Sequence, residues 1–375
     1  MTSTSVHGAA AWLGFCGAGV RLPASRRHGG RGVGDQTVIV SVDEIMDEAR
    51  RVVTPALRRV ADGFDPVVRD VIAHHFGWEQ AGGGGKVLRA ALTLTAASGF
   101  ASPDARSAVS GAVAVELLHN FSLLHDDIMD RDLTRRQRPT AWTVFGVGPA
   151  LLAGDALFAA AFGALADIPS DAAQAAQRRL TATATHMVIG QAADATFGGR
   201  WSAALGDYER MVAGKTAALL SCAMAIGAEL EGAPRTAVDR LAAAGHHAGL
   251  AFQAVDDVLG IWGDPAATGK ANRGDLREGK LTLPILLARD AAGERRDELH
   301  HLLAAAAADD GAAGDGAAGD SAAALIEDLG GRADATAFAG AQLEAAEGHV
   351  AALDLPPPIG RPLTDLLRFV IDRLW

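Results

Sequence analysis

Apolar residues recur every three or four positions along nearly the whole chain from Val42 onward. This spacing gathers them on one face of a helix, and the two-residue alternation of half-buried strands is nearly absent. Glycine- or proline-containing breaks separate segments long enough for full helices, and these breaks lie at residues 82–85, 102–104, 198–199, 263–265 and 356–358. The pattern therefore predicts an all-α protein.

Two regions depart from this pattern. The first 34 residues contain four arginines, no acid and no helical periodicity, so we expect residues 1–40 to be a disordered basic, glycine-rich tail. Its apolar patch precedes its basic residues, the reverse of a secretory signal, although a docking partner or an organelle-targeting role for the tail stays open. Residues 304–324 are of low complexity and predict a surface loop between two late helices. We expect residues 41–375 to form a single domain.

Composition and charge exclude several classes of function. The 375 residues are 49% hydrophobic and carry a net charge of -11, which disfavours generic binding to nucleic acids or anionic membranes. No apolar run reaches the roughly 18 residues of a membrane helix, since the nearest candidate, residues 151–166, is interrupted by Asp155. The two cysteines form no disulfide framework. We expect a cytoplasmic protein without a membrane span.

The first candidate site is an acidic cluster in an apolar helical context. Asp126 and Asp130 are one helical turn apart and share a face, and Asp127 adjoins them. Like charges at this spacing repel one another, more strongly where apolar neighbours lower the local dielectric, and a divalent cation would relieve the repulsion. The alternative is a solvated acidic helix face.

Cations flank this cluster on both sides. Arg135 and Arg136 follow it, and Lys86 and Arg89 stand upstream, directly after a glycine run that lets the backbone approach an anion. Mg²⁺ typically binds one or two carboxylates plus substrate phosphates, while arginine forks bind the remaining phosphate oxygens. The set predicts a diphosphate site, whereas the glycine-lysine motif alone would indicate only a flexible loop before a basic helix face.

A second acidic cluster repeats this chemistry far along the chain. Asp256 and Asp257 end an apolar helical segment, in a motif that begins at Phe252-Gln253. A glycine-rich loop follows, and it contains Asp264, Lys270, Asp275 and Lys280. Lys215 beside Thr216 adds a further cation, which by itself would be a solvated charge at a helix end.

These motifs, in this order, resemble the trans-isoprenyl diphosphate synthases, also called polyprenyl synthetases. The resemblance covers nearly everything from Val42 to the C-terminus. Its motifs are GGK-x-x-R at residues 84–89, H-x-x-S-L-x-H-D-D-x-x-D at 119–130, RR at 135–136, KT at 215–216 and F-Q-x-x-D-D at 252–257.

The resemblance implies a fold, an activity and a set of partners. The fold would be a single-domain helical bundle around a deep central cavity, with the two acidic motifs facing each other across its mouth. The activity would be Mg²⁺-dependent condensation of isopentenyl diphosphate with an allylic diphosphate, with three metal ions in each active site. Family members usually pair as homodimers.

The resemblance also implies residue roles. Asp126, Asp127 and Asp130 would hold two Mg²⁺ ions, and Asp256 with Asp257 would hold a third. Isopentenyl diphosphate would be bound by Lys86, Arg89, His119 and Arg136. The allylic diphosphate would be bound by Arg135, Lys215 and Lys270, and Thr216 and Gln253 would face the developing allylic cation.

Some positions depart from the family pattern. Gly260 stands where the second motif usually has its last aspartate, and Asp264, one turn further on, is the expected substitute. We therefore expect that restoring aspartate at position 260 raises the rate or tightens the dependence on Mg²⁺. Ala90 and Ala271 replace the usual prolines and Gln137 replaces a usual glycine, which changes the expected turn geometry.

Product length should depend on Phe121 and Ser122, which lie beneath the first acidic motif. Phe121 is five residues before Asp126, about one and a half helical turns deeper, so its ring can form a floor for the growing chain. An aromatic at this depth, without an insertion in the motif, resembles synthases of the C20 product geranylgeranyl diphosphate. The C15 product farnesyl diphosphate is the alternative, and Phe121 as a simple core residue is another.

Two other functions stay open. A class I terpene cyclase would share the first acidic motif but would leave Lys86, Arg89 and Arg136 without a role. A non-catalytic regulatory subunit of the same fold is favoured only by Gly260.

Overall fold

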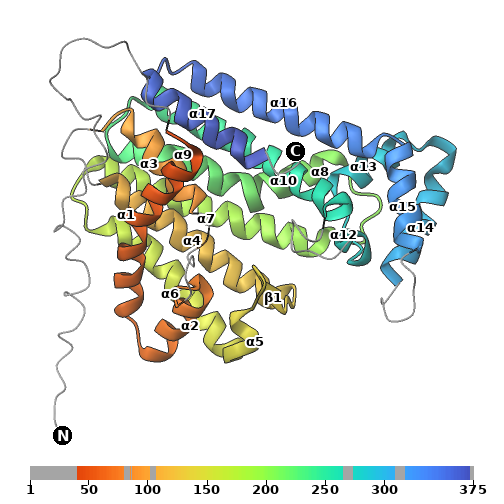
Figure 1. Ribbon diagram of the computed structural model, residues 1–375, viewed down its shortest axis with the longest axis horizontal. Coiled ribbons are helices and arrows are strands. Elements are labelled where there is room, and N and C mark those ends of the chain that lie inside the picture. Colours follow the sequence, from red (N-terminus) through yellow and green to blue (C-terminus); the bar gives the residue numbers. More distant parts are fainter. Residues whose placement is uncertain are drawn as a thin grey trace, which may run out of the picture. The chain divides into compact units, whose positions relative to one another are not determined.

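A computed structural model describes residues 40–79, 85, 87–101, 107–264, 273–308 and 317–371. The expected disordered tail, apart from Val40, lies outside the described residues, as do Lys86, Lys270 and Ala271. The described part of the chain is almost entirely helical, which confirms the predicted all-α class (Figure 1).

The helices and strands follow one another in this order: α1 Val42–Asp62, α2 Pro66–Phe76, α3 Leu88–Ser98, α4 Ser107–Met129, β1 Thr134–Arg135, β2 Arg138–Pro139, α5 Ala141–Phe145, α6 Val147–Ala166, α7 Asp171–Phe197, α8 Leu205–Val212, the π-helix η1 Ala213–Ala217, α9 Ala218–Leu230, α10 Arg235–Trp262, α12 Gly274–Arg277, α13 Leu283–Ala291, the 3-10 helix η2 Gly293–Arg295, α14 Arg296–Ala308, α15 Ala317–Asp328, α16 Gly331–Ala351 and α17 Pro357–Ile371.

The chain forms two compact units that are interleaved in sequence. Unit 1 comprises residues 1–181, 223–238 and 356–362, and unit 2 comprises residues 182–222, 239–355 and 363–375. The chain passes from one unit to the other inside the helices α7, α9, α10 and α17. The single domain expected over residues 41–375 stays a prediction.

Unit 1 is built around α4, which packs against α6 and α3. Its first helix has a capping box, because the Ser41 side chain accepts from the Glu44 backbone N–H and the Glu44 carboxylate accepts from the Ser41 N–H. A distant segment completes the unit: the buried Thr93 hydroxyl donates to the Ala223 carbonyl, 2.8 Å away, and the Ala108 N–H donates to Glu231 Oε1, 2.9 Å away.

Unit 2 packs α13 against α16 and α14 against α15. The stretch expected as a surface loop over residues 304–324 is shorter than predicted, since α14 runs to Ala308 and α15 begins at Ala317. Alanine, the best helix former, dominates both flanks, so the low complexity of this stretch does not prevent helix formation there. Residues 309–316 lie outside the described residues.

Three helical stretches are long and apolar enough to cross a membrane, by length and composition alone. They are Ser107–Met129, Val147–Ala166 and Leu205–Leu230, and 67%, 39% and 72% of their most apolar windows are buried inside the protein. Core packing accounts for the apolar character of the first and third. The smaller buried share of α6 leaves apolar side chains at the surface. The expected absence of a membrane span stays a prediction.

Candidate active site

The end of α4 carries the first acidic motif. Asp126 and Asp127 lie in its last turns, and the Asp130 N–H donates to the Asp126 carbonyl over 2.8 Å, so the helical path continues to Asp130. The carboxylates of Asp126 and Asp130 therefore start one turn apart on one face, as the spacing predicts. Asp126 is half-buried and Asp130 is exposed, which places this face at the edge of the unit.

Asp127 is the buried member of the motif, and Arg135 is its cationic partner. Its side chain is 2% exposed, and its Oδ1 accepts a hydrogen bond from Arg135 Nε. Burial raises the pKa of the Asp127 carboxyl, and the Arg135 guanidinium opposes this rise. Among the described residues no hydrogen-bond donor reaches the other oxygen, the buried Oδ2. A buried acceptor of this kind is suited to a cation.

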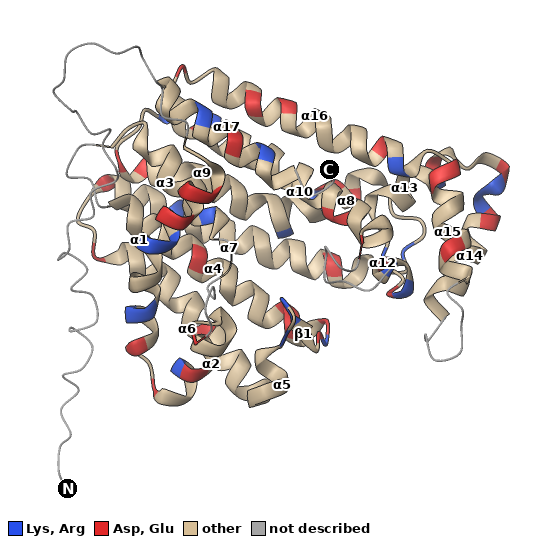
Figure 2. Cartoon of the chain, in the orientation of Figure 1, with Lys and Arg blue, Asp and Glu red and all other residues tan. Residues whose placement is uncertain are grey.

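A two-residue hairpin positions both arginines that follow the motif. Strands β1 and β2 pair antiparallel with Arg135 opposite Arg138, and the ribbon at the hairpin carries both basic and acidic residues (Figure 2). The turn residues Arg136 and Gln137 have φ values of 52° and 62°. A two-residue turn with two positive φ values matches the right-handed twist of a hairpin. Glycine adopts this conformation without strain, which explains why Gln137 is an unusual residue here.

The residues expected to bind isopentenyl diphosphate gather within unit 1. Arg89 Nη1 lies 3.1 Å from His119 Nε2. Burial, followed by the charges of Arg89 and Arg136, lowers the pKa of His119 well below its usual value, so a neutral imidazole accepts from the guanidinium. A Cβ atom built on Gly85 would lie 2.6 Å from Arg136 Nη1. The glycine run therefore ends against this arginine, and Lys86 lies outside the described residues.

Three further residues support this cluster, and the sequence patterns did not single them out. Buried Glu116 accepts a 3.0 Å hydrogen bond from the Ala90 N–H, which a proline at position 90 would lack. His75 Nε2 donates to Asn120 Oδ1 over 3.1 Å, and burial lowers the pKa of His75 to about 3. The partners in these two hydrogen bonds lie 26 and 45 residues apart in the chain, so no local sequence pattern indicates them.

Phe121 lies beside aromatic rings of its own unit. Its ring centroid is 4.8 Å from that of Phe158 on α6, and Phe158 lies 5.1 Å from Phe162. The ring of His125 meets Phe121 edge-on at 4.8 Å. Half-buried Phe121 is thus the first of three phenylalanines in a row between α4 and α6, and Ser122 donates to the His119 carbonyl.

In unit 2, the π-helix η1 carries Lys215 and Thr216. A Cβ atom on Gly190 would lie 2.1 Å from the Lys215 backbone nitrogen, and one on Gly214 would lie 2.7 Å from the His186 carbonyl oxygen. These two glycines let α7 and η1 approach closely. The Lys215 ammonium pairs with Asp194 of α7. Wide turns of this kind often mark functional sites in helices.

Asp257 is the centre of a hydrogen-bond network in unit 2. Its Oδ1 accepts from Gln253 Nε2 over 2.9 Å, and its Oδ2 accepts from the Tyr208 hydroxyl over 2.7 Å and the Leu283 N–H over 2.9 Å. Gln253 in turn accepts from the Thr216 hydroxyl over 2.8 Å. Burial raises the pKa of Asp257 to about 7, although the three donors favour its charged form. Gln253 and Thr216 are therefore oriented by Asp257.

Tyr208, the single tyrosine of the chain, was missed by the sequence reasoning. It stands 49 residues before its partner, in a segment without a motif. Burial raises the pKa of its hydroxyl, and the charges of Asp257, Asp256 and Asp275 raise it further. Three carboxylates thus lie within electrostatic reach of one hydroxyl.

The position of Gly260 is sterically closed. A Cβ atom there would lie 1.8 Å from Asp275 Oδ2 and 2.5 Å from its Cγ. An aspartate at position 260 would have to displace the carboxylate of Asp275, which argues against the expectation that it improves the site. Asp264, the expected substitute, lies exposed just after α10, whereas Asp275 is buried.

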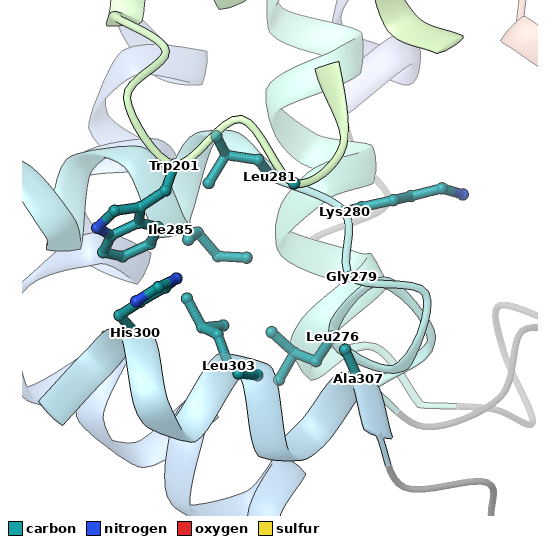
Figure 3. A pocket seen from close by; sticks show the side chains of 11 residues that line it. Trp201, Leu276, Gly279, Lys280, Leu281, Ile285, His300, Leu303 and Ala307 are labelled. Atoms are coloured by element: carbon teal, nitrogen blue, oxygen red, sulfur yellow. The ribbon is translucent and has the colours of Figure 1, made fainter. Parts of the chain in front are cut away.

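Unit 2 also contains a cavity of about 240 Å³ (Figure 3). The stacked rings of Trp201 and His300, with centroids 4.7 Å apart, form one wall, and Leu281, Ile285 and Leu303 are among the other lining residues. The residues to which the family resemblance gives a role do not line this cavity. The deep central cavity expected from the family resemblance stays a prediction.

Within the described ranges, no group of three or more His, Cys, Asp or Glu side chains is arranged to hold a metal ion by itself. This fits the chemistry of Mg²⁺, which typically takes one or two carboxylates and completes its shell with water and substrate phosphates. The buried Oδ2 of Asp127 and the half-buried Asp126 beside it offer oxygen donors of the required kind.

Comparisons with known proteins identify the family of the chain. Residues 73–315 match the polyprenyl synthetase family. A (2E,6E)-farnesyl diphosphate synthase of Mycobacterium tuberculosis is 42% identical over 339 residues, which are 88% of this chain and 92% of the relative. A geranylgeranyl diphosphate synthase of the same organism is also 42% identical, over 70% of this chain and 77% of the relative.

A solved structure shares the fold. The crystal structure of a polyprenyl synthetase from Streptomyces coelicolor is 42% identical, covers 88% of this chain and all of its own, and superposes with a TM-score of 0.82. The family match spans more than half of the chain, and relatives at this identity span most of their own length. The chain therefore belongs to the polyprenyl synthetases, the trans-isoprenyl diphosphate synthase family of prenyltransferases.

Proposed function

We propose that this protein condenses isopentenyl diphosphate with an allylic diphosphate and releases an all-trans prenyl diphosphate longer by one isoprene unit at each step. The observation that carries the proposal is the geometry of unit 1. A carboxylate face at the end of α4 lies in the same compact unit as a cluster of cations formed by Arg89, Arg135 and Arg136.

The carboxylates are proposed to hold Mg²⁺. Asp126, Asp127 and Asp130 would serve the first motif, and Asp256 and Asp257 the second. Bound Mg²⁺ would neutralise the diphosphate as negative charge develops on it. The buried Asp127 Oδ2 supports this assignment most directly, since cation binding would satisfy an oxygen that no donor among the described residues reaches.

Different cations would bind the two substrates. Arg89, His119 and Arg136, with Lys86, would bind the diphosphate of isopentenyl diphosphate. The neutral His119 accepts from Arg89 and so fixes the orientation of its guanidinium. Arg135, Lys215 and Lys270 would bind the allylic diphosphate, and the ion pairs of Arg135 with Asp127 and of Lys215 with Asp194 hold two of these cations in place beforehand.

The reaction breaks the allylic C–O bond, and the electron pair leaves with the diphosphate. The double bond of isopentenyl diphosphate then attacks the allylic carbon, and the released diphosphate takes the proton lost from the product. Thr216 and Gln253 would direct oxygen atoms toward the allylic cation. Their mutual hydrogen bond, anchored on Asp257, preorganises these dipoles before charge develops.

We favour geranylgeranyl diphosphate, the C20 product, because the half-buried ring of Phe121 lies beneath the acidic motif and is backed by Phe158. Farnesyl diphosphate, the C15 product, is the alternative, since one of the two mycobacterial relatives bears that name. A homodimer is also proposed, with the exposed apolar side chains of Val144, Val147, Leu151 and Leu152 supporting it.

Product analysis tests the proposal. Purified protein is incubated with isopentenyl diphosphate, Mg²⁺ and a starter of five, ten or fifteen carbons, and the products are identified by mass spectrometry. We expect elongation to C20 and a loss of about 100-fold or more in rate for Asp126→Ala, because electrostatic groups of this kind are typically worth that much. Near-normal turnover by a folded Asp126→Ala variant would contradict the mechanism. Absence of products with every starter, together with retained diphosphate binding, would favour a regulatory subunit.

A further inference from the structure

We propose that Asp275 supplies the carboxylate that the second acidic motif lacks at position 260. The motif then consists of Asp256 and Asp275 as metal-facing groups and Asp257 as their support. The proposal concerns residues of unit 2 only, and it rests on the proposed function for the identity of the ligand, Mg²⁺.

The packing around Gly260 is the first observation. Atoms that are not bonded to one another pack about 3.5–4.0 Å apart, yet a Cβ atom at position 260 would lie 1.8 Å from Asp275 Oδ2. Because Gly260 has no side chain, it leaves a space on α10, here called the cradle, and the carboxylate of Asp275 fills this space. Asp275, in the short helix α12, is 8% exposed, so few other positions are open to its side chain.

Helix geometry gives that carboxylate its neighbours. Asp256 and Gly260 are four residues apart on α10, so they share one face. A carboxylate that sits in the cradle at Gly260 lies on the face that presents Asp256. It takes the place where the last aspartate of the family motif would begin, although it comes from a different helix.

The hydrogen bonds of Asp257 complete the assignment. Both of its oxygens are engaged, by three donors from Gln253, Tyr208 and Leu283. A carboxylate with three donors is a structural anchor. We assign the metal-facing roles to Asp256, which shares a helix face with Gly260, and to Asp275, whose carboxylate fills the space at Gly260. This revises the assignment made above, which paired Asp256 with Asp257.

A double-mutant cycle of thermal stability, here called the stability cycle, tests the packing and needs no measurement of activity. Gly260→Ala should lower the thermal unfolding midpoint, since its Cβ overlaps the Asp275 carboxylate. In the Asp275→Ala background the same Gly260→Ala change should lower it far less, because the overlapping atoms are gone. Gly340→Ala on α16, where nothing lies within 4 Å of a built Cβ, is the matched control and should be neutral or stabilising. A Gly260→Ala variant as stable as Gly340→Ala would overturn the packing argument.

Metal binding tests the chemistry. Mn²⁺ replaces Mg²⁺ as a probe, inorganic diphosphate is present in place of substrate, and electron paramagnetic resonance counts the bound ions. We expect Asp275→Ala and Asp275→Asn to lose one ion or to bind it at least 10-fold more weakly. Asp264→Ala should bind Mn²⁺ like the unmodified protein.

Moving the carboxylate from position 275 to position 260 provides the sharpest comparison. Gly260→Asp alone should bind Mn²⁺ worse, because two side chains compete for one space. Gly260→Asp combined with Asp275→Ala should recover much of the lost binding, since the acid then enters from α10 as in other family members. Full Mn²⁺ binding by Asp275→Ala, or full loss by Asp264→Ala, would overturn the proposal.

The outcomes separate this inference from the proposed function. If the unmodified protein elongates prenyl chains but Asp275→Ala binds Mn²⁺ normally, only the role of Asp275 fails. If the unmodified protein makes no product, the prenyltransferase proposal fails, while the stability cycle still decides whether Asp275 fills the space at Gly260.

Discussion

A single glutamine holds a backbone conformation that glycine adopts at lower cost. Gln137, at the second position of the hairpin turn, has a φ of 62°. A side chain in this left-handed region costs roughly 1–2 kcal/mol, partly offset in glycine by its greater loss of backbone entropy. We expect Gln137→Gly to raise the free energy of unfolding by up to about 1 kcal/mol. Chemical denaturation measures it, with Gln137→Ala as the control that keeps the Cβ atom. An alanine variant as stable as the glycine variant would refute the argument.

Asp257 should give the metal-free protein a recognisable pH dependence. Burial raises its pKa from 3.8 to about 7. Between these values the folded state holds a proton that the unfolded state has released, so the contribution of Asp257 to stability falls as the pH rises from about 4 to 7. His75, whose pKa is lowered to about 3, acts in the opposite direction between about pH 6.5 and 3.

The difference between two unfolding curves isolates the contribution of Asp257. Stability is measured by denaturation with a chelator present, from pH 4 to 8, for the unmodified protein and for Asp257→Asn. The variant will be less stable overall, because an amide replaces an acceptor of three hydrogen bonds, so the slope is the readout. Its stability should fall less steeply with rising pH than that of the unmodified protein. Parallel curves would show that Asp257 titrates normally.

Residues that act together with near neighbours in the chain were predictable from the sequence. Residues whose partners are distant in the chain were not. Asp126 and Asp130 repeat at helical spacing, so their shared face follows from four residues of sequence. Tyr208 acquires its role only when the fold brings it to Asp257, 49 residues later. The same holds for Asp275: the sequence places it among the charged residues of the following loop, but its contact with Gly260 appears only in the fold.

The packing of α4 on α6 should decide the length of the product. Phe121 on α4 rests on Phe158 of α6, with ring centroids 4.8 Å apart, so its ring cannot turn aside without moving its neighbour. We expect Phe121→Ala to lengthen the product distribution by at least one isoprene unit, because the floor beneath the chain is removed. Mass analysis of the products measures this. Phe162→Ala, at the far end of the row, should leave the distribution unchanged. An active Phe121→Ala variant with the original products would place the floor elsewhere.

At the level of elements, periodicity predicted the helices well and their irregularities poorly. The π-helix at residues 213–217 depends on a close approach between Gly190 and Gly214, and such a tertiary contact leaves no periodic trace. The two-residue strands β1 and β2 are too short for a pattern of alternation. The surface loop expected at residues 304–324 is too long, because alanine favours helix at both of its ends.

For the whole molecule, the apolar surface of unit 1 predicts self-association. Val147 and Leu151 lie one turn apart on α6, Val144 lies just before them on α5, and Leu152 beside Leu151 is 59% exposed. Burial of such side chains in a second copy would stabilise a dimer by roughly 25 cal/mol per Å² of apolar area, before the cost of association. We expect Leu152→Glu to shift the protein from dimer to monomer in light scattering after size exclusion. Val67→Glu, exposed on α2, is the matched control and should not. A monomeric unmodified protein would contradict the homodimer.

The interleaving of the two units has a consequence for synthesis. Thr93 of α3 and Ala108 of α4 are synthesised more than a hundred residues before their partners, Ala223 and Glu231. During that interval the Ala108 amide depends on water, and the apolar face of α4 that α9 will cover stays accessible. Unit 1 is complete only when residues 356–362 have been added, more than a hundred residues after α9. The nascent chain must therefore be kept from aggregating until that late segment has been made.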